Sequence, residues 1–126
     1  MLVQPELTVA GGAQRASDLR AALTARHREL ADEHAEAVAE MTLAGVVDAG
    51  DDVADLGTKA FSRDQEFAVA MSIRVRMDQV ERALERLDEG GYGWCERCGN
   101  PIPVERLAAF PSATLCVRCK SLSERR

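Results

Sequence analysis

The clearest pattern along this chain is an apolar stripe in its second half. Six apolar residues follow one another at alternating steps of three and four: Ala70, Ile73, Met77, Val80, Leu84 and Leu87. This spacing places them on one face of an α-helix and is typical of a coiled-coil seam. A thinner stripe with heptad-like spacing precedes it: Leu19, Leu23, Leu30, Ala37 and Met41. The stripes predict two long helices, each apolar on one face only, so each is expected to pack mainly on the other.

The boundaries of these helices can also be predicted. The first helix is expected to run from about Ser17, a residue type suited to an N-cap, to about Ala49. Residues 62–65, with the sequence SRDQ, fit a capping box, so the regular part of the second helix is predicted to begin there. The glycine pair at residues 90–91 is predicted to end it. Residues 1–14 show little periodicity and are predicted to form a flexible N-terminal arm, or else a short helix that docks elsewhere.

An acidic segment separates the two stripes. Residues 49–57 read AGDDVADLG, and together with Asp48 they place four carboxylates within eight positions. A continuous helix through this segment, as in a parallel dimer, would make like-charge neighbours that cost about 0.2–0.5 kcal/mol each. Gly50 would add about 1 kcal/mol against the helix. The sequence therefore predicts an all-α protein: a long antiparallel helical hairpin (coiled coil) over residues 15–90, with an acidic tip near residues 48–57, in a monomer.

All four cysteines lie in the last third of the chain. They form two Cys-x2-Cys pairs separated by 17 residues: Cys95, Cys98, Cys116 and Cys119. This arrangement is a strong signal for a tetrahedral four-thiolate zinc site, and four protein ligands leave no open position for substrate. We expect residues 91–126 to form a small C-terminal four-cysteine zinc finger with a short C-terminal helix, stabilised by one structural Zn²⁺. A redox-active pair and a disulfide framework are the weaker alternatives.

Composition and charge reduce the number of function classes that fit this sequence. The net charge of −5 is carried by the helical part, whereas residues 91–126 contain six bases and three acids. An acidic body argues against DNA binding as the main activity. We find no phosphate-binding glycine loop and no nucleophile with a base partner, so no enzymatic activity is predicted. His27 and His34 are expected to be seam or surface residues. No signal peptide or membrane-spanning stretch is recognised, and a cytoplasmic protein that does not bind membranes is expected.

The combined pattern resembles the DksA/TraR group of bacterial transcription factors. The resemblance covers roughly residues 15–121 and is most specific in LDEGGYGWCERCG and LCVRCK. It implies that the four cysteines are the zinc ligands and that Asp52, Asp55 and Gly57 form the active tip, where the family has Asp-x-x-Asp-x-Ala. It also implies a regulator that enters the secondary channel of RNA polymerase and modulates initiation at its tip, without sequence-specific DNA binding.

Two departures from the family pattern affect these expectations. The tip alanine of the family is Gly57 here. The basic residues of the alarmone-responsive members correspond to Gln79, Phe110 and Lys120, of which only Lys120 keeps a cation, so dependence on ppGpp is expected to be weak or absent. Two other functions remain open at this point. One is a Gre-like transcript-cleavage factor, and the other is a coiled-coil and zinc-ribbon adaptor for another assembly.

Overall fold

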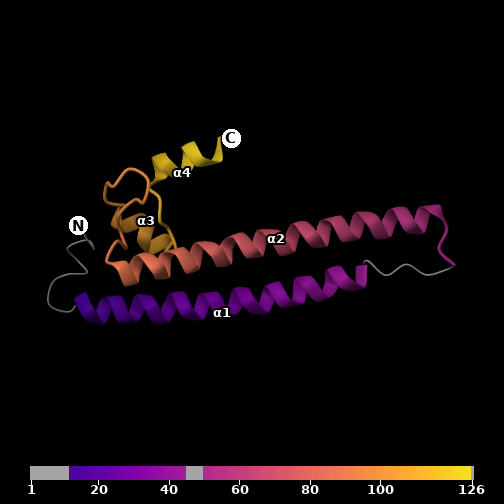
Figure 1. Ribbon diagram of the computed structural model, residues 1–126, viewed down its shortest axis with the longest axis horizontal. Helices are drawn as coiled ribbons and strands as arrows, with labels where there is room; N and C mark the ends of the chain where they lie inside the picture. The colour runs from indigo at the N-terminus through magenta and orange to yellow at the C-terminus, as the bar shows by residue number, and fades with distance from the viewer. Residues whose placement is uncertain (1–11, 45–49, 126) are drawn as a thin grey trace. The chain divides into compact units, whose positions relative to one another are not determined.

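The computed structural model describes residues 12–44 and 50–125. These ranges contain four helices: α1 (Gly12–Ala44), α2 (Val53–Glu89), α3 (Val104–Ala109) and α4 (Val117–Glu124) (Figure 1). Within them no β-strand forms, and one isolated antiparallel bridge joins Trp94 to Pro101. No helix in the described ranges is both long enough and apolar enough to cross a membrane. The predicted all-α class is confirmed.

The described residues fall into two compact units. One contains residues 12–27 and 78–125, and the other contains residues 28–44 and 50–77. Both long helices therefore contribute to both units, and the division does not follow the predicted boundary at residue 90. The zinc-finger segment belongs to the same unit as the start of α1 and the end of α2.

In the first unit, the start of α1 packs along the end of α2. Leu23 on α1 and Val80, Ala83 and Leu87 on α2 are buried. Arg20 pairs with Asp88, and His27 Nε2 lies 2.8 Å from Glu81 Oε2. A step of seven residues forward on α1 is thus matched by seven residues back on α2, which shows that the helices run antiparallel. His27, predicted to be a seam or surface residue, is half-buried beside the seam.

In the second unit, α1 and α2 also pack through a buried seam, and this seam becomes polar toward the start of α2. Its buried residues are Leu30, Ala37, Ala70, Ile73 and Met77. Nearer the start of α2, the seam positions are the partly buried Lys59, Ser62 and Glu66. Burial, followed by a hydrogen bond with Glu40, raises the pKa of Glu66. Within this unit the two helices are therefore held by apolar packing, and by polar contacts nearer the acidic segment.

The predicted helix starts were wrong at both helices. α1 begins at Gly12, five residues before the predicted cap Ser17, because the intervening Ala, Gln and Arg residues are themselves good helix formers. Residues 12–14 of the predicted arm are thus helical, and residues 1–11 lie outside the described residues, as do Asp48 and Ala49.

α2 begins at Val53 rather than within residues 62–65, because Asp52 caps it. The Asp55 backbone N–H donates to Asp52 Oδ1 at 2.8 Å, and the Leu56 N–H donates to the Asp52 carbonyl at 3.0 Å. These bonds satisfy donors that a helix start otherwise leaves unpaired. Asp55 and Gly57 consequently lie in the first turns of a helix rather than in a loop.

The predicted end of α2 is confirmed. The helix stops at Glu89, and Gly90 follows with a φ of 84°, a left-handed conformation that favours glycine. The N–H groups of Gly91 and Tyr92 then donate to the Arg86 carbonyl at 2.8 and 3.1 Å. This turn directs the chain into the cysteine segment.

Candidate metal centre and acidic tip

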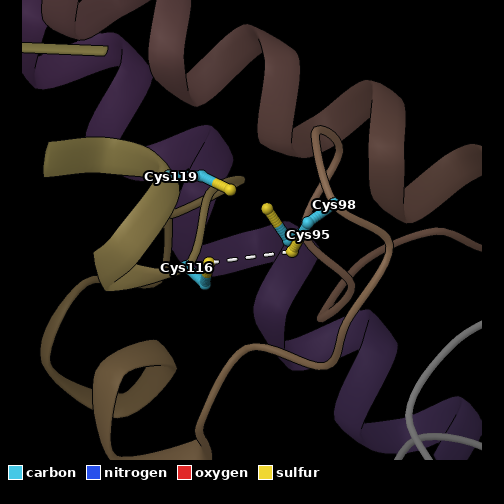
Figure 2. A group of neighbouring side chains, drawn as sticks. All are labelled: Cys95, Cys98, Cys116 and Cys119. Carbon is cyan, nitrogen blue, oxygen red and sulfur yellow. Dashed lines mark hydrogen bonds between the residues drawn. The ribbon is translucent and has the colours of Figure 1, made fainter. Parts of the chain in front are cut away.

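The four cysteines predicted as metal ligands lie together. Their Sγ atoms are all within 4.8 Å of one another, and those of Cys98 and Cys116 are 3.8 Å apart. Figure 2 shows the four sulfur atoms facing one shared space. With Zn–S bonds of about 2.3 Å, the sulfur atoms of a tetrahedral site lie about 3.8 Å apart. The four thiols therefore fit one structural Zn²⁺, whose binding would close the coordination shell with protein ligands alone.

Local backbone structure presents these sulfur atoms. Gly99 has a φ of 76°, and its N–H donates to the Cys95 carbonyl at 2.9 Å. This bond closes the turn that contains the first cysteine pair, Cys95 and Cys98. Cys116 immediately precedes α4, and Cys119 lies in the first turn of that helix. The first pair is thus held in a tight turn and the second at a helix start, where backbone N–H groups favour negative charge.

A small apolar cluster supports the centre. Cys95, Ile102 and Cys119 are buried, with Leu107 and Leu115 packed against them. Tyr92 is also buried, and its hydroxyl donates to the Pro111 carbonyl at 2.7 Å. Burial raises the pKa of Tyr92 to about 12, so the phenol keeps the proton that it donates. This core is too small to fold a segment alone, which agrees with a metal that contributes folding free energy.

The protein environment affects the cysteines unequally. Burial raises the pKa of the Cys95 thiol, but hydrogen bonds from the backbone N–H groups of Cys98, Cys116 and Arg97 outweigh it and lower the pKa to about 6. Burial and the neighbouring cysteines raise the pKa of Cys119 to about 12. Four thiolates at this spacing repel one another, and a divalent cation is the group that would allow all four to lose their protons.

Sequence reasoning missed two arginines that join the end of α2 to the first cysteine pair. Arg82 Nε donates to Glu96 Oε1 at 2.7 Å, and Arg86 Nη2 donates to the Trp94 carbonyl at 2.8 Å. Cations four residues apart near the end of a helix are a visible signal, since the helix C-terminus favours positive charge. Their partners depend on how the chain folds back after Gly90, and the sequence alone does not give this.

The acidic tip has three described aspartates with different surroundings. Asp51 pairs with Lys59, and Asp52 caps α2. The Asp55 side chain is exposed, and among residues 12–44 and 50–125 it has no hydrogen-bond or ion-pair partner. Gly57 is helical and exposed, and a β-carbon there would meet no heavy atom within 4 Å beyond the local helix backbone. Of these carboxylates, Asp55 is the one most available to a partner.

The three positions linked by resemblance to alarmone response also lie together. Gln79, Phe110 and Lys120 line one cleft of about 400 Å³, together with Arg106 and Glu124. Lys120 Nζ lies 3.5 Å from Glu124 Oε1. Arg106 donates to the Leu115 carbonyl at 3.0 Å and lies over the Phe110 ring. The two cations of the cleft are therefore already engaged within the protein.

Comparisons with known proteins agree with this architecture. Residues 90–125 match the prokaryotic dksA/traR C4-type zinc finger. The RNA polymerase-binding transcription factor DksA of Haemophilus influenzae is 35% identical over 109 residues, which cover 83% of this chain and 71% of that protein. DksA of Escherichia coli K12 is 34% identical over 67 residues, covering 50% of this chain and 44% of that protein. The structure of transcription factor DksA2 from Pseudomonas aeruginosa is similar, with a TM-score of 0.74 and 31% identity, covering 98% of this chain and 92% of that one.

Fold and site together define a helical-hairpin protein with a C4-type zinc finger. Because the similarity to the Haemophilus protein extends over most of both chains, this chain belongs to the DksA/TraR family. The resemblance inferred from the cysteine segment and the acidic tip is confirmed at the level of the family.

Proposed function

We propose that this protein is a transcription regulator that binds RNA polymerase. The observation that carries the proposal is the 35% identity, over 71% of its length, to a protein named as an RNA polymerase-binding transcription factor. The cysteine cluster supports a structural zinc finger rather than a catalytic metal, because four protein ligands leave no coordination position for substrate. We accordingly propose a non-enzymatic role in the cytoplasm, where the polymerase acts.

The hairpin is proposed to enter the secondary channel of the polymerase and to act through its tip. The exposed carboxylates of Asp52 and Asp55, at the start of α2, support this proposal. A cluster of negative charge suits a channel that leads to a magnesium centre and its basic surroundings. In this proposal, the tip biases the polymerase during initiation and no base of the promoter is read.

The test separates binding from regulation. Core polymerase is captured with the wild-type protein and with Asp52→Asn/Asp55→Asn, and transcription from a ribosomal promoter is measured with each. Asparagine keeps the N-cap at residue 52, so the double variant removes charge with little effect on α2. We expect most binding to remain and the promoter effect to be lost. Asp64→Asn, an exposed carboxylate elsewhere on α2, is the matched control and should act as wild type.

Other outcomes decide between the remaining functions. If the wild-type protein captures no polymerase, the proposal is wrong and the adaptor function gains support. If it stimulates cleavage of a backtracked transcript, and Asp52→Asn/Asp55→Asn does not, the protein is a Gre-like cleavage factor instead.

The effect of ppGpp is proposed to be weak or absent. A polyphosphate needs several cations, and the cleft that contains Gln79, Phe110 and Lys120 is lined by two cations, Arg106 and Lys120, and by the carboxylate of Glu124 beside Lys120. Calorimetric titration of ppGpp into the complex, compared with polymerase alone, tests this. A further binding site that requires this protein would contradict the proposal.

A further inference from the structure

Arg86 contacts the main chain on both sides of the turn that leads to the first zinc ligand. Its Nη2 donates to the carbonyl oxygens of Gly91 at 3.1 Å and Trp94 at 2.8 Å. Its own carbonyl accepts the N–H groups of Gly91 and Tyr92. One residue of α2 therefore fixes the backbone over residues 91–94, directly before Cys95.

The guanidinium group of Arg86 packs directly against Gly91. A β-carbon at residue 91 would lie 2.8 Å from Arg86 Cζ, which is closer than atoms can approach. Glycines with a positive φ in the described ranges are Gly90, Gly93 and Gly99, so Gly91 is not required by its backbone conformation. The glycine at this position instead leaves the space that the arginine occupies.

The Arg86 side chain keeps this position although its Nε–H group has no hydrogen-bond acceptor among the described residues. Arg86 Nε and Trp94 Nε1 are both buried and have no hydrogen-bond partner among the described residues. A long, flexible side chain that gained nothing from this site would be expected to turn its guanidinium toward water. Its two bonds to carbonyl oxygens are the contacts that keep it in place.

A second contact anchors the other side of Cys95. Arg82 Nε donates to Glu96 Oε1, and the Glu96 backbone N–H donates to the Thr114 carbonyl at 2.9 Å, two residues before Cys116. Hydrogen bonds with Glu85 and then Glu96 raise the pKa of Arg82, so this cation stays charged. Trp94 and Glu96, the residues on either side of Cys95, are therefore both hydrogen-bonded to arginine side chains of α2.

We propose that Arg86 is a positioning residue of the zinc centre. It fixes the backbone of residues 91–94 so that the Cys95 sulfur is already placed for the metal when the other three cysteines bind it. Groups outside the ligand set that orient a metal ligand typically contribute about 10–100-fold in metal affinity. Loss of the Arg86 bonds is therefore expected to speed zinc release without changing the number of ligands.

The experiment uses the full zinc-loaded chain. Arg86→Met keeps the length of the side chain and removes the donors, and Arg86→Lys keeps the charge with a single donor centre. The release of zinc to an excess of chelator is timed, and the emission of Trp94, the one tryptophan of the chain, reports the backbone segment itself. We expect release to be about 10-fold faster in Arg86→Met and intermediate in Arg86→Lys. A red-shifted emission is expected in Arg86→Met. Arg76→Met, an exposed arginine of α2 that lies in the other compact unit, should match wild type.

Gly91→Ala provides an independent test, because its methyl group displaces the guanidinium rather than the backbone. It should speed zinc release in the wild-type background and have no further effect in the Arg86→Met background, since the two changes remove the same contact. Equal release rates and equal Trp94 emission in wild type, Arg86→Met and Gly91→Ala would overturn the proposal. So would additive effects in the double variant. If Arg86→Met does not fold, Gly91→Ala alone decides the matter by the same two measurements.

Discussion

Around the cysteines, side-chain hydrogen bonds join residues that are 8 to 19 positions apart, whereas the described bonds of Asp52 at the acidic tip stay within the first turn of α2. Arg82 and Arg86 of α2 reach Glu96 and Trp94, and the Tyr92 hydroxyl reaches the Pro111 carbonyl. At the tip, the described bonds of Asp52 join it to residues three and four positions ahead. A change near the cysteines should therefore disturb the fold of that segment. A change at the tip should alter binding chemistry at little cost in stability, as is common for functional surfaces.

The largest expected effect comes from removal of a metal ligand. Cys98→Ser should lose the zinc ion and melt residues 90–120, since structural zinc contributes about 10–16 kcal/mol in zinc-finger peptides. Most helix should remain, because the seam of α1 and α2 contains no cysteine. Native mass spectrometry gives the zinc content, and hydrogen exchange locates the melted segment. Arg97→Ser is the control, and one zinc per chain in Cys98→Ser would refute the four-cysteine site.

The next largest expected effect is a loss of stability when a buried residue of the seam between α1 and α2 is truncated. Leu30 is 1% exposed, so Leu30→Ala should lower the free energy of unfolding by about 2–5 kcal/mol. Leu43, on the same helix, is 73% exposed, and Leu43→Ala should change it by about 0.5 kcal/mol or less. Urea unfolding followed by circular dichroism measures both. Equal losses in the two variants would show that the seam lies on another face of α1.

A smaller effect separates the cap from the charge at Asp52. Asp52→Ala should cost about 0.5–2 kcal/mol, because the Asp55 N–H loses its acceptor, and Asp52→Asn should be nearly neutral. Thermal unfolding of the two variants side by side measures the difference. If asparagine and alanine destabilise the protein equally, the carboxylate charge matters more to α2 than the cap.

The smallest expected effect is a gain in stability rather than a loss. Gly57 is helical with open space around it, so Gly57→Ala should stabilise the protein by about 0.4–1 kcal/mol. By the resemblance described above, the substitution would also introduce the alanine of the family's tip motif. A thermal melt shows the gain, and destabilisation would mean that residue 57 needs a conformation that alanine disfavours.

Much of the fold could be predicted from the sequence because its signals are repetitive. Five of the six residues in the stripe from Ala70 to Leu87 are buried in α2, whereas the predicted Leu84 is half-buried and its neighbour Ala83 is fully buried instead. The start of α2 could not be located in the same way. Both Asp52 and Ser62 are residue types that cap helices, and only the folded chain shows that Asp52 accepts the Asp55 N–H.

The candidate sites were predictable to different degrees. The Cys-x2-Cys spacing correctly predicted four sulfur atoms around one point. The functional roles of Asp52, Asp55 and Gly57 stay predictions, since exposure alone does not identify a partner. The contacts of Arg86 were missed, because they depend on the return of the chain after Gly90 and on the space left by Gly91.

We propose that the tip of this protein reaches the active centre of RNA polymerase, and site-specific photocrosslinking tests this proposal most directly. Val53 is 86% exposed and adjoins Asp52, so a photoreactive benzoylphenylalanine can replace it without disturbing the seam. We predict a crosslink to polymerase peptides that line the secondary channel beside the catalytic magnesium, lost when excess unmodified protein competes. Crosslinks only to the outer surface of the polymerase, or none from a protein that still binds it, would contradict the account.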